Sequence, residues 1–75
     1  MIRGLNFSIM YLKIANGYKA KDGEKVRTKP NKKGILYFLS FEKGEWYLKH
    51  EEREDLTIYI EPGGNTSFIY PDKLL

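Results

Sequence analysis

Residues 5–16 form the first apolar stretch of the chain, and its pattern fits two different elements. As a helix, the stretch gathers its apolar residues on one face, which would comprise Phe7, Met10, Tyr11 and Ile14. Asn6 would cap that helix, and the dipeptide Asn16-Gly17 would supply a left-handed stop. As a strand, the stretch would lead into a two-residue hairpin turn at the same dipeptide. We expect the helix, over residues 6–16, and keep the hairpin as the rival interpretation.

The rest of the chain has the pattern of short antiparallel strands separated by turn residues. The expected strands span residues 18–21, 25–28, 35–41, 46–49, 56–60 and 66–70. Asp22-Gly23 is expected to join the first two of them as a hairpin, whereas Pro30 keeps residues 29–34 out of any sheet. Residues 35–41 are apolar on both faces, which predicts the central strand, covered on each side.

These elements predict an α+β fold, in which a short N-terminal helix packs on a small antiparallel β-sheet. The alternative is a small all-β barrel. Residues 1–75 are expected to form a single domain. A chain of 75 residues without cysteine buries only about 60% of its unfolded surface and has no disulfide to staple it. Because such small domains often gain burial by association, we expect a homo-oligomer.

Charge is distributed unevenly along the chain, although its net value is only +3. Residues 19–33 carry seven basic and two acidic side chains, whereas residues 42–55 carry six acidic and three basic ones. Residues 51–55 are interpreted as a solvated acidic loop; the alternative is that they pair with the basic segment of a neighbouring subunit. The basic segment favours an anionic partner. Since no apolar run approaches 18 residues and no signal peptide is evident, we expect no membrane association and a cytoplasmic location.

The basic segment offers groups that bind phosphate and bases. Arg27 grips phosphate with a bidentate fork, whereas Lys29 and Lys32 offer mobile point charges. Asn31 can read a base edge or a ribose hydroxyl. Tyr37 is the expected stacking residue, because Phe38 and Phe41 are expected in the core. The alternative is that the lysines are merely solvated and the aromatic side chains are all core.

Catalytic and metal-binding chemistry find little support in the sequence. His50 is the single histidine, it stands next to two glutamates in the most polar run, and we expect it in an exposed loop. The chain has no cysteine, no calcium-loop spacing, no phosphate loop and no Gly-x-Ser-x-Gly sequence. We therefore expect neither an enzyme nor a cofactor.

One arrangement of short motifs resembles a known family. Asn6-Phe7 is followed by Leu12-Lys13, by Gly17-Tyr18-Lys19 and, after an insertion, by the basic-to-aromatic run 31–39. This order is similar to small phage proteins of the Thoeris anti-defence type-two family, in which a glycine follows the phenylalanine by ten residues. The resemblance covers about the first 40 residues. Pro30 stands where that family has a loop tryptophan.

The resemblance implies a function. Such proteins are non-enzymatic oligomers that sequester the cyclic nucleotide signal of a bacterial immune system, so this chain would act in the host cytoplasm. By position, the loop residues carried over are Asn31, Lys32 and Gly34. One alternative is a small phage protein that inhibits a host enzyme or nuclease by direct binding. Another is a small single-strand nucleic-acid-binding β domain.

Overall fold

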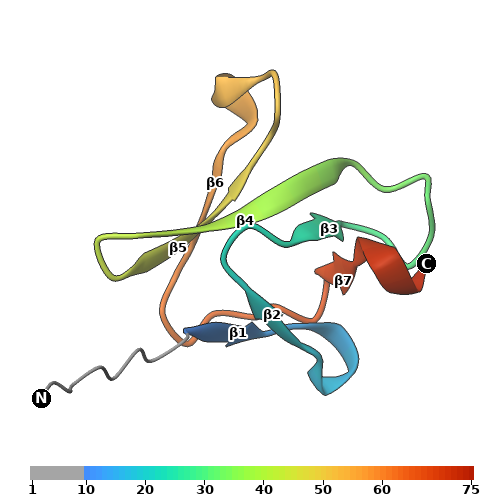
Figure 1. Ribbon diagram of the computed structural model, residues 1–75, viewed down its shortest axis with the longest axis horizontal. Helices are drawn as coiled ribbons and strands as arrows, with labels where there is room; N and C mark the ends of the chain where they lie inside the picture. Colours follow the sequence, from blue (N-terminus) through green and yellow to red (C-terminus); the bar gives the residue numbers. More distant parts are fainter. Residues whose placement is uncertain (1–9) are drawn as a thin grey trace, which may run out of the picture.

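The computed structural model describes residues 10–75, and this part of the chain is almost entirely β (Figure 1). Its strands are β1 (Tyr11–Lys13), β2 (Lys19–Lys21), β3 (Lys25–Arg27), β4 (Leu36–Glu42), β5 (Glu45–Lys49), β6 (Ile58–Ile60) and β7 (Tyr70–Pro71). Its only helical elements are the short 3-10 turns η1 (Ala15–Gly17), η2 (Glu54–Leu56) and η3 (Asp72–Leu74). The predicted α+β fold is therefore wrong, and the all-β class of the alternative is the one observed.

The N-terminal apolar stretch forms a hairpin instead of the predicted helix. β1 pairs with β2 in antiparallel register, with Leu12 opposite Ala20. Asn16 and Gly17 both have a positive φ, 60° and 74°, and the Tyr18 amide donates to the Ala15 carbonyl at 3.2 Å. This is the geometry of a type I′ turn, which suits the twist of a hairpin. The helix prediction is wrong for residues 10–16, and residues 6–9 lie outside the described part.

The larger sheet has five antiparallel strands in the order β6-β5-β4-β3-β7. β3 to β6 follow one another as a meander, and β7 returns to lie beside β3. β4 is the central strand, as predicted. Its turn to β5 passes through Lys43-Gly44, with Glu42 opposite Glu45. Of the strand predicted over residues 66–70, only Tyr70 lies in a strand, as the first residue of β7.

Asp22-Gly23 makes a turn, but the predicted hairpin between the flanking strands is wrong. β2 belongs to the two-stranded sheet and β3 to the five-stranded sheet. Gly23 has a φ of 88°, and its amide donates to the Leu39 carbonyl at 2.8 Å. The turn therefore carries the chain from one sheet to the other.

The core lies on the inner face of the larger sheet, where the small hairpin covers it. It comprises Ile14, Ala20, Val26, Tyr37, Leu39, Leu48, Ile60 and Ile69. Two hydrogen bonds attach the hairpin to the segment between β6 and β7. The Ala15 amide donates to the Ile69 carbonyl at 2.9 Å, and the Thr66 hydroxyl donates to the Lys13 carbonyl at 2.6 Å. The hairpin is thus a fixed part of the domain.

None of the helical turns in residues 10–75 has the length and apolar character needed to cross a membrane.

Candidate functional site

Arg27, the strongest phosphate ligand of the predicted site, is engaged within the chain through its Nε and Nη1. Its Nε donates to Oδ1 of Asp72 at 2.6 Å, and its Nη1 donates to the carbonyls of Lys32 and Gly34, each at 2.9 Å. The side chain is only 18% exposed. Arg27 therefore shapes the loop from inside, and Asp72 is the partner that sequence reasoning missed.

The neighbouring predicted residues also have structural roles. Lys32 Nζ donates to Asp72 Oδ1 at 2.9 Å, and Asn31 Oδ1 accepts the Lys33 amide at 2.8 Å in a local turn. Gly34 is buried, and a Cβ there would lie 2.6 Å from the backbone nitrogen of Lys29. The structure brings Arg27 and Lys32 together at Asp72, places Asn31 and Gly34 in the same loop, and leaves Lys29 exposed.

Tyr37 cannot be a surface for stacking, because it is 4% exposed and belongs to the core. Its ring meets that of His50 edge-on, with centroids 6.1 Å apart. Phe38 instead points to the outer face and is only partly buried. The prediction of an exposed Tyr37 and a core Phe38 is therefore wrong. Alternation along β4 separates the two residues correctly, but only the position of the second layer decides which face is inside.

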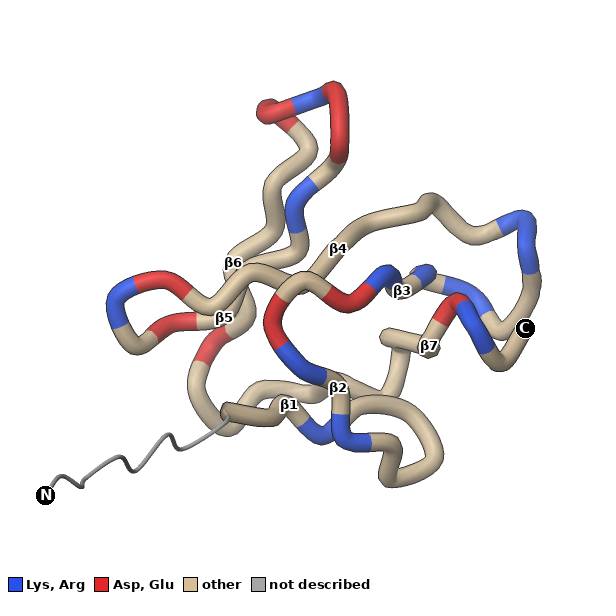
Figure 2. Tube along the Cα trace, viewed as in Figure 1, with Lys and Arg blue, Asp and Glu red and all other residues tan. Residues whose placement is uncertain are grey.

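An exposed basic face occurs elsewhere, on the outer side of the β1–β2 hairpin. We call the outward side chains of Tyr11, Lys13, Lys19 and Lys21 the hairpin face. Tyr11 lies opposite Lys21, and Lys13 lies opposite Lys19, so all four project from the same side. Tyr11 is 51% exposed. Figure 2 shows the lysines of the two strands gathered at this end of the molecule.

The electrostatics of the hairpin face are unfavourable in the free protein. Directly opposite residues of an antiparallel pair have Cβ atoms about 5 Å apart, and like charges there are destabilising. None of the three lysines forms an ion pair with a carboxylate in residues 10–75. Ala20, which is buried, and Leu12, which is partly buried, pack on the reverse side and hold the strands in this register. The face thus keeps uncompensated positive charge beside an exposed ring.

Sequence reasoning missed this face because it assigned Tyr11 to the buried side of a helix. The available signal was the alternation of Lys19, Ala20 and Lys21, which places two lysines on one side of a strand and a small apolar residue on the other.

The outer face of the larger sheet is also aromatic, but carboxylates accompany its rings. The hydroxyls of Tyr47 and Tyr59 donate to the two oxygens of Glu45, at 3.3 and 3.0 Å. The hydrogen bond to Glu45 raises the pKa of Tyr59, and burial together with Glu45 raises the pKa of Tyr47. Lys49 is paired with Glu42 at 2.5 Å, and this bond lowers the pKa of Glu42. Such a face repels phosphate.

His50 has a structural role in the part of the chain that is described. Its Nδ1 accepts the amides of Glu52 and Arg53, at 3.1 and 3.0 Å, and so holds the turn that follows β5. The ring is partly buried, unlike the exposed loop histidine that was predicted. Within residues 10–75, no group of three metal-ligating side chains is clustered.

Comparison of the chain with protein-family models, with curated proteins and with solved structures found no match. The resemblance to the Thoeris anti-defence type-two family therefore stays a prediction.

Proposed function

We propose that this protein is a non-enzymatic binder of single-stranded nucleic acid and that the hairpin face holds the strand. One observation carries the proposal. Lys13 and Lys19 lie directly opposite each other beside the exposed Tyr11, and within residues 10–75 neither is paired with a carboxylate. A bound phosphate removes this repulsion, so the arrangement favours an anionic ligand.

The exposed ring favours a single strand over a duplex. An aromatic side chain can stack on any unpaired base, whereas a duplex hides its base faces. Lys19 and Lys21 are two residues apart on one strand, about 6.6 Å, which lets them reach neighbouring phosphates of an extended chain. The hairpin face thus offers stacking and charge without requiring a particular base sequence.

Sequestration of a cyclic nucleotide at the loop has less support. Asp72 already pairs with both Arg27 and Lys32, and Tyr37 lies in the core. A ligand at that loop would have to compete with these internal partners. We therefore keep the cyclic nucleotide as a competitor in the binding experiment.

Fluorescence anisotropy with a labelled oligothymidylate, the matching oligouridylate and a duplex of equal length tests the proposal. We expect saturable binding of both single strands and weaker binding of the duplex. Three phosphate contacts predict that log K falls with log salt at a slope of about −2. A cyclic nucleotide should not displace the strand at equal concentration.

Variants of the hairpin face sharpen the test. Tyr11→Ala should weaken binding roughly ten-fold or more, whereas Tyr11→Phe should retain it. The triple change of Lys13, Lys19 and Lys21 to alanine should abolish the salt-dependent binding. The control Lys43→Asn removes one lysine from the β4–β5 turn, where asparagine tolerates the φ of 52°. Equal affinity of the triple variant and the control, or no binding at low salt, would contradict the proposal.

A further inference from the structure

Two oppositely charged segments flank the sheet away from the hairpin face. The basic loop, residues 28–35, connects β3 to β4, and the acidic arm, residues 50–57, connects β5 to β6. Figure 2 shows the lysines on the first and the carboxylates on the second, on either side of the start of β4. The two segments thus present opposite charges at two separate places on the molecule.

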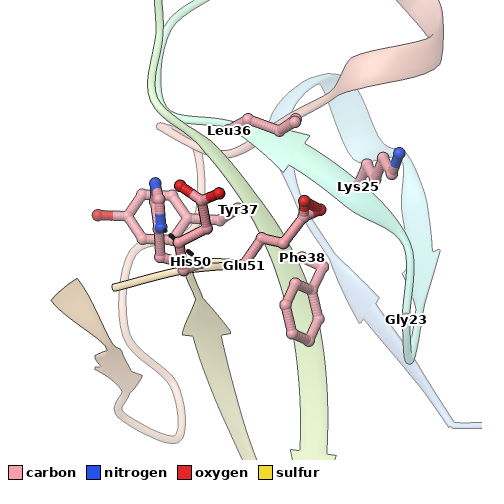
Figure 3. A pocket seen from close by; sticks show the side chains of 8 residues that line it. Gly23, Lys25, Leu36, Tyr37, Phe38, His50 and Glu51 are labelled. Atoms are coloured by element: carbon pink, nitrogen blue, oxygen red, sulfur yellow. Dashed lines mark hydrogen bonds between the residues drawn. The ribbon is translucent and has the colours of Figure 1, made fainter. Parts of the chain in front are cut away.

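A groove lies between the acidic arm and β4 on the outer face of the sheet (Figure 3). Its first part is a cavity of about 330 Å³, lined on the sheet side by Lys25, Leu36, Tyr37 and Phe38 and on the arm side by His50, Glu51 and Glu52. A second hollow of about 570 Å³ is lined by the same three arm residues and also by Glu42 and Glu54. The first hollow therefore combines apolar side chains with two carboxylates and one lysine, and the second hollow is more acidic.

Two cations near the carboxylates are already paired, whereas Lys25, which lines the first cavity, has no ion pair within residues 10–75. Arg53 binds Asp55 through two hydrogen bonds, at 2.9 and 2.7 Å, and Lys49 binds Glu42. Within residues 10–75, no lysine or arginine is paired with Glu51, Glu52 or Glu54. These three carboxylates are free to meet a cation from outside.

The arm is held in place, so the groove exists before anything binds. His50 Nδ1 accepts two amides of the arm, and the Thr57 hydroxyl donates to the Glu54 carbonyl at 2.8 Å. A preformed groove loses less conformational entropy when it is filled.

The basic loop has the features that this groove would take. Lys29 and Lys33 are exposed, and Ile35, at the end of the loop, is 49% exposed. Arg27 holds the backbone of the loop through the carbonyls of Lys32 and Gly34. The loop therefore presents an apolar side chain next to cations on a fixed backbone, the complement of an apolar hollow next to carboxylates.

We infer that the groove is occupied by the basic loop of a second copy of this chain. Ile35 of each copy covers Leu36 and Phe38 of the other, while Lys29 and Lys33 meet the acidic arm. In each copy the basic loop is followed directly by Leu36, which lines the groove. A twofold arrangement therefore lets the loop of each copy enter the groove of the other at the same time. Twofold dimers are the commonest homo-oligomers. The hairpin face takes no part, so this inference is independent of nucleic-acid binding.

The two kinds of contact have different effects on the dimer. Exposed ion pairs contribute little affinity, but they fix the orientation and make association sensitive to salt. Burial of Ile35 and Phe38 supplies most of the driving force. The dimer is accordingly reversible and dependent on concentration.

Sedimentation equilibrium of the full chain over a range of concentrations tests the inference. We expect the mass to rise from 8.8 kDa towards twice that value as the concentration increases, and to fall only modestly at high salt. The decisive comparison is between the masses of two charge-reversed proteins, each measured alone and in a mixture. One has Glu51→Lys with Glu54→Lys, and the other has Lys29→Glu with Lys33→Glu.

Each charge-reversed protein alone should be monomeric, since its loop and its groove then carry the same sign. A mixture of the two should regain the dimer, because each loop again meets a groove of opposite sign. Lys13→Glu, on the hairpin face, is the matched control and should dimerise like the unchanged protein. Circular dichroism shows that each variant is folded.

Three outcomes would overturn the inference. They are a monomer at every concentration, dimers of the reversed proteins as strong as those of the unchanged chain, and a mixture that stays monomeric. Binding of a lysine-rich peptide by a chain that stays monomeric would assign the groove to another partner. Oligonucleotide binding by a monomer would leave the proposed function intact while removing the dimer.

Discussion

Arg27 Nε donates to Asp72 Oδ1 at 2.6 Å across a sequence separation of 45 residues, and this contact joins β3 to the last turn of the chain. The same carboxylate oxygen accepts Lys32 Nζ, so one acidic side chain organises both the C-terminal turn and the basic loop. The contact also determines which cations of the loop remain available to a partner.

Loss of Arg27 should destabilise the domain. Arg27→Ala leaves Asp72 and the loop carbonyls without their donor, and hydrogen bonds to charged groups contribute about 1.5–3 kcal/mol each. We expect the free energy of unfolding in urea to fall by about 2 kcal/mol or more. Lys29→Ala, an exposed change in the same loop, should stay within about 0.5 kcal/mol of the unchanged protein. Similar effects of the two changes would contradict a stabilising role for the hydrogen bonds of Arg27.

Acid should weaken the pairing of Asp72 with Arg27 and Lys32. Hydrogen bonds from Arg27 and then from Lys32 hold the pKa of Asp72 below its ordinary value of 3.8. The folded state therefore binds this proton less readily than the unfolded state. The stabilisation is present in full above the unfolded value and is lost as the pH falls through the lower, folded value.

Urea unfolding from neutral pH to below pH ~4 measures this loss. Asp72→Asn should lower stability at neutral pH and flatten the acid limb of the stability curve. Asp55→Asn is the control, because Arg53 lowers the pKa of Asp55 in an exposed pair that contributes less. An unchanged acid limb in Asp72→Asn would show that other carboxylates dominate it.

Gly34 should tolerate no side chain. A Cβ at this buried position would lie 2.6 Å from the Lys29 backbone nitrogen, so the loop would have to move. We expect Gly34→Ala to cost about 1–3 kcal/mol in thermal or urea unfolding. Lys33→Ala, at the adjacent exposed position, serves as its control. Full stability of Gly34→Ala would mean that the loop can open without cost.

Two tyrosines should separate stability from binding. Tyr37→Ala removes a core side chain and should cost about 3–5 kcal/mol, like other aromatic truncations in cores. Tyr11→Ala changes an exposed residue and should alter stability by less than about 0.5 kcal/mol while weakening oligonucleotide binding. The reverse pattern would restore Tyr37 as the ligand residue.

The opposed lysines should show a trade-off between stability and binding. Lys13→Glu places a carboxylate opposite Lys19 and should raise the free energy of unfolding by about 0.2–1 kcal/mol. The same change should weaken oligonucleotide binding, because it removes one cation and adds a repulsive charge. A variant that loses stability, or binds as before, would argue against the role of this pair.

Several elements could be predicted from the sequence because their signals are local. Pro30 excludes the basic loop from the sheet, Lys43-Gly44 makes a tight hairpin, and the apolar run before it becomes the central strand. The site was less predictable. Asp72 meets Arg27 only because β7 returns beside β3, and no local pattern encodes that distant contact.

The sequence by itself determined where the chain turns, where it is extended, and how its charge is divided between a basic and an acidic segment. The tertiary structure alone decided that residues 11–13 form a strand, since Asn16-Gly17 can end a helix or turn a hairpin. It also decided that Tyr37 faces inward and Tyr11 outward. The physical reason is that alternation divides a strand into two faces, whereas burial depends on which other part of the chain covers one of them.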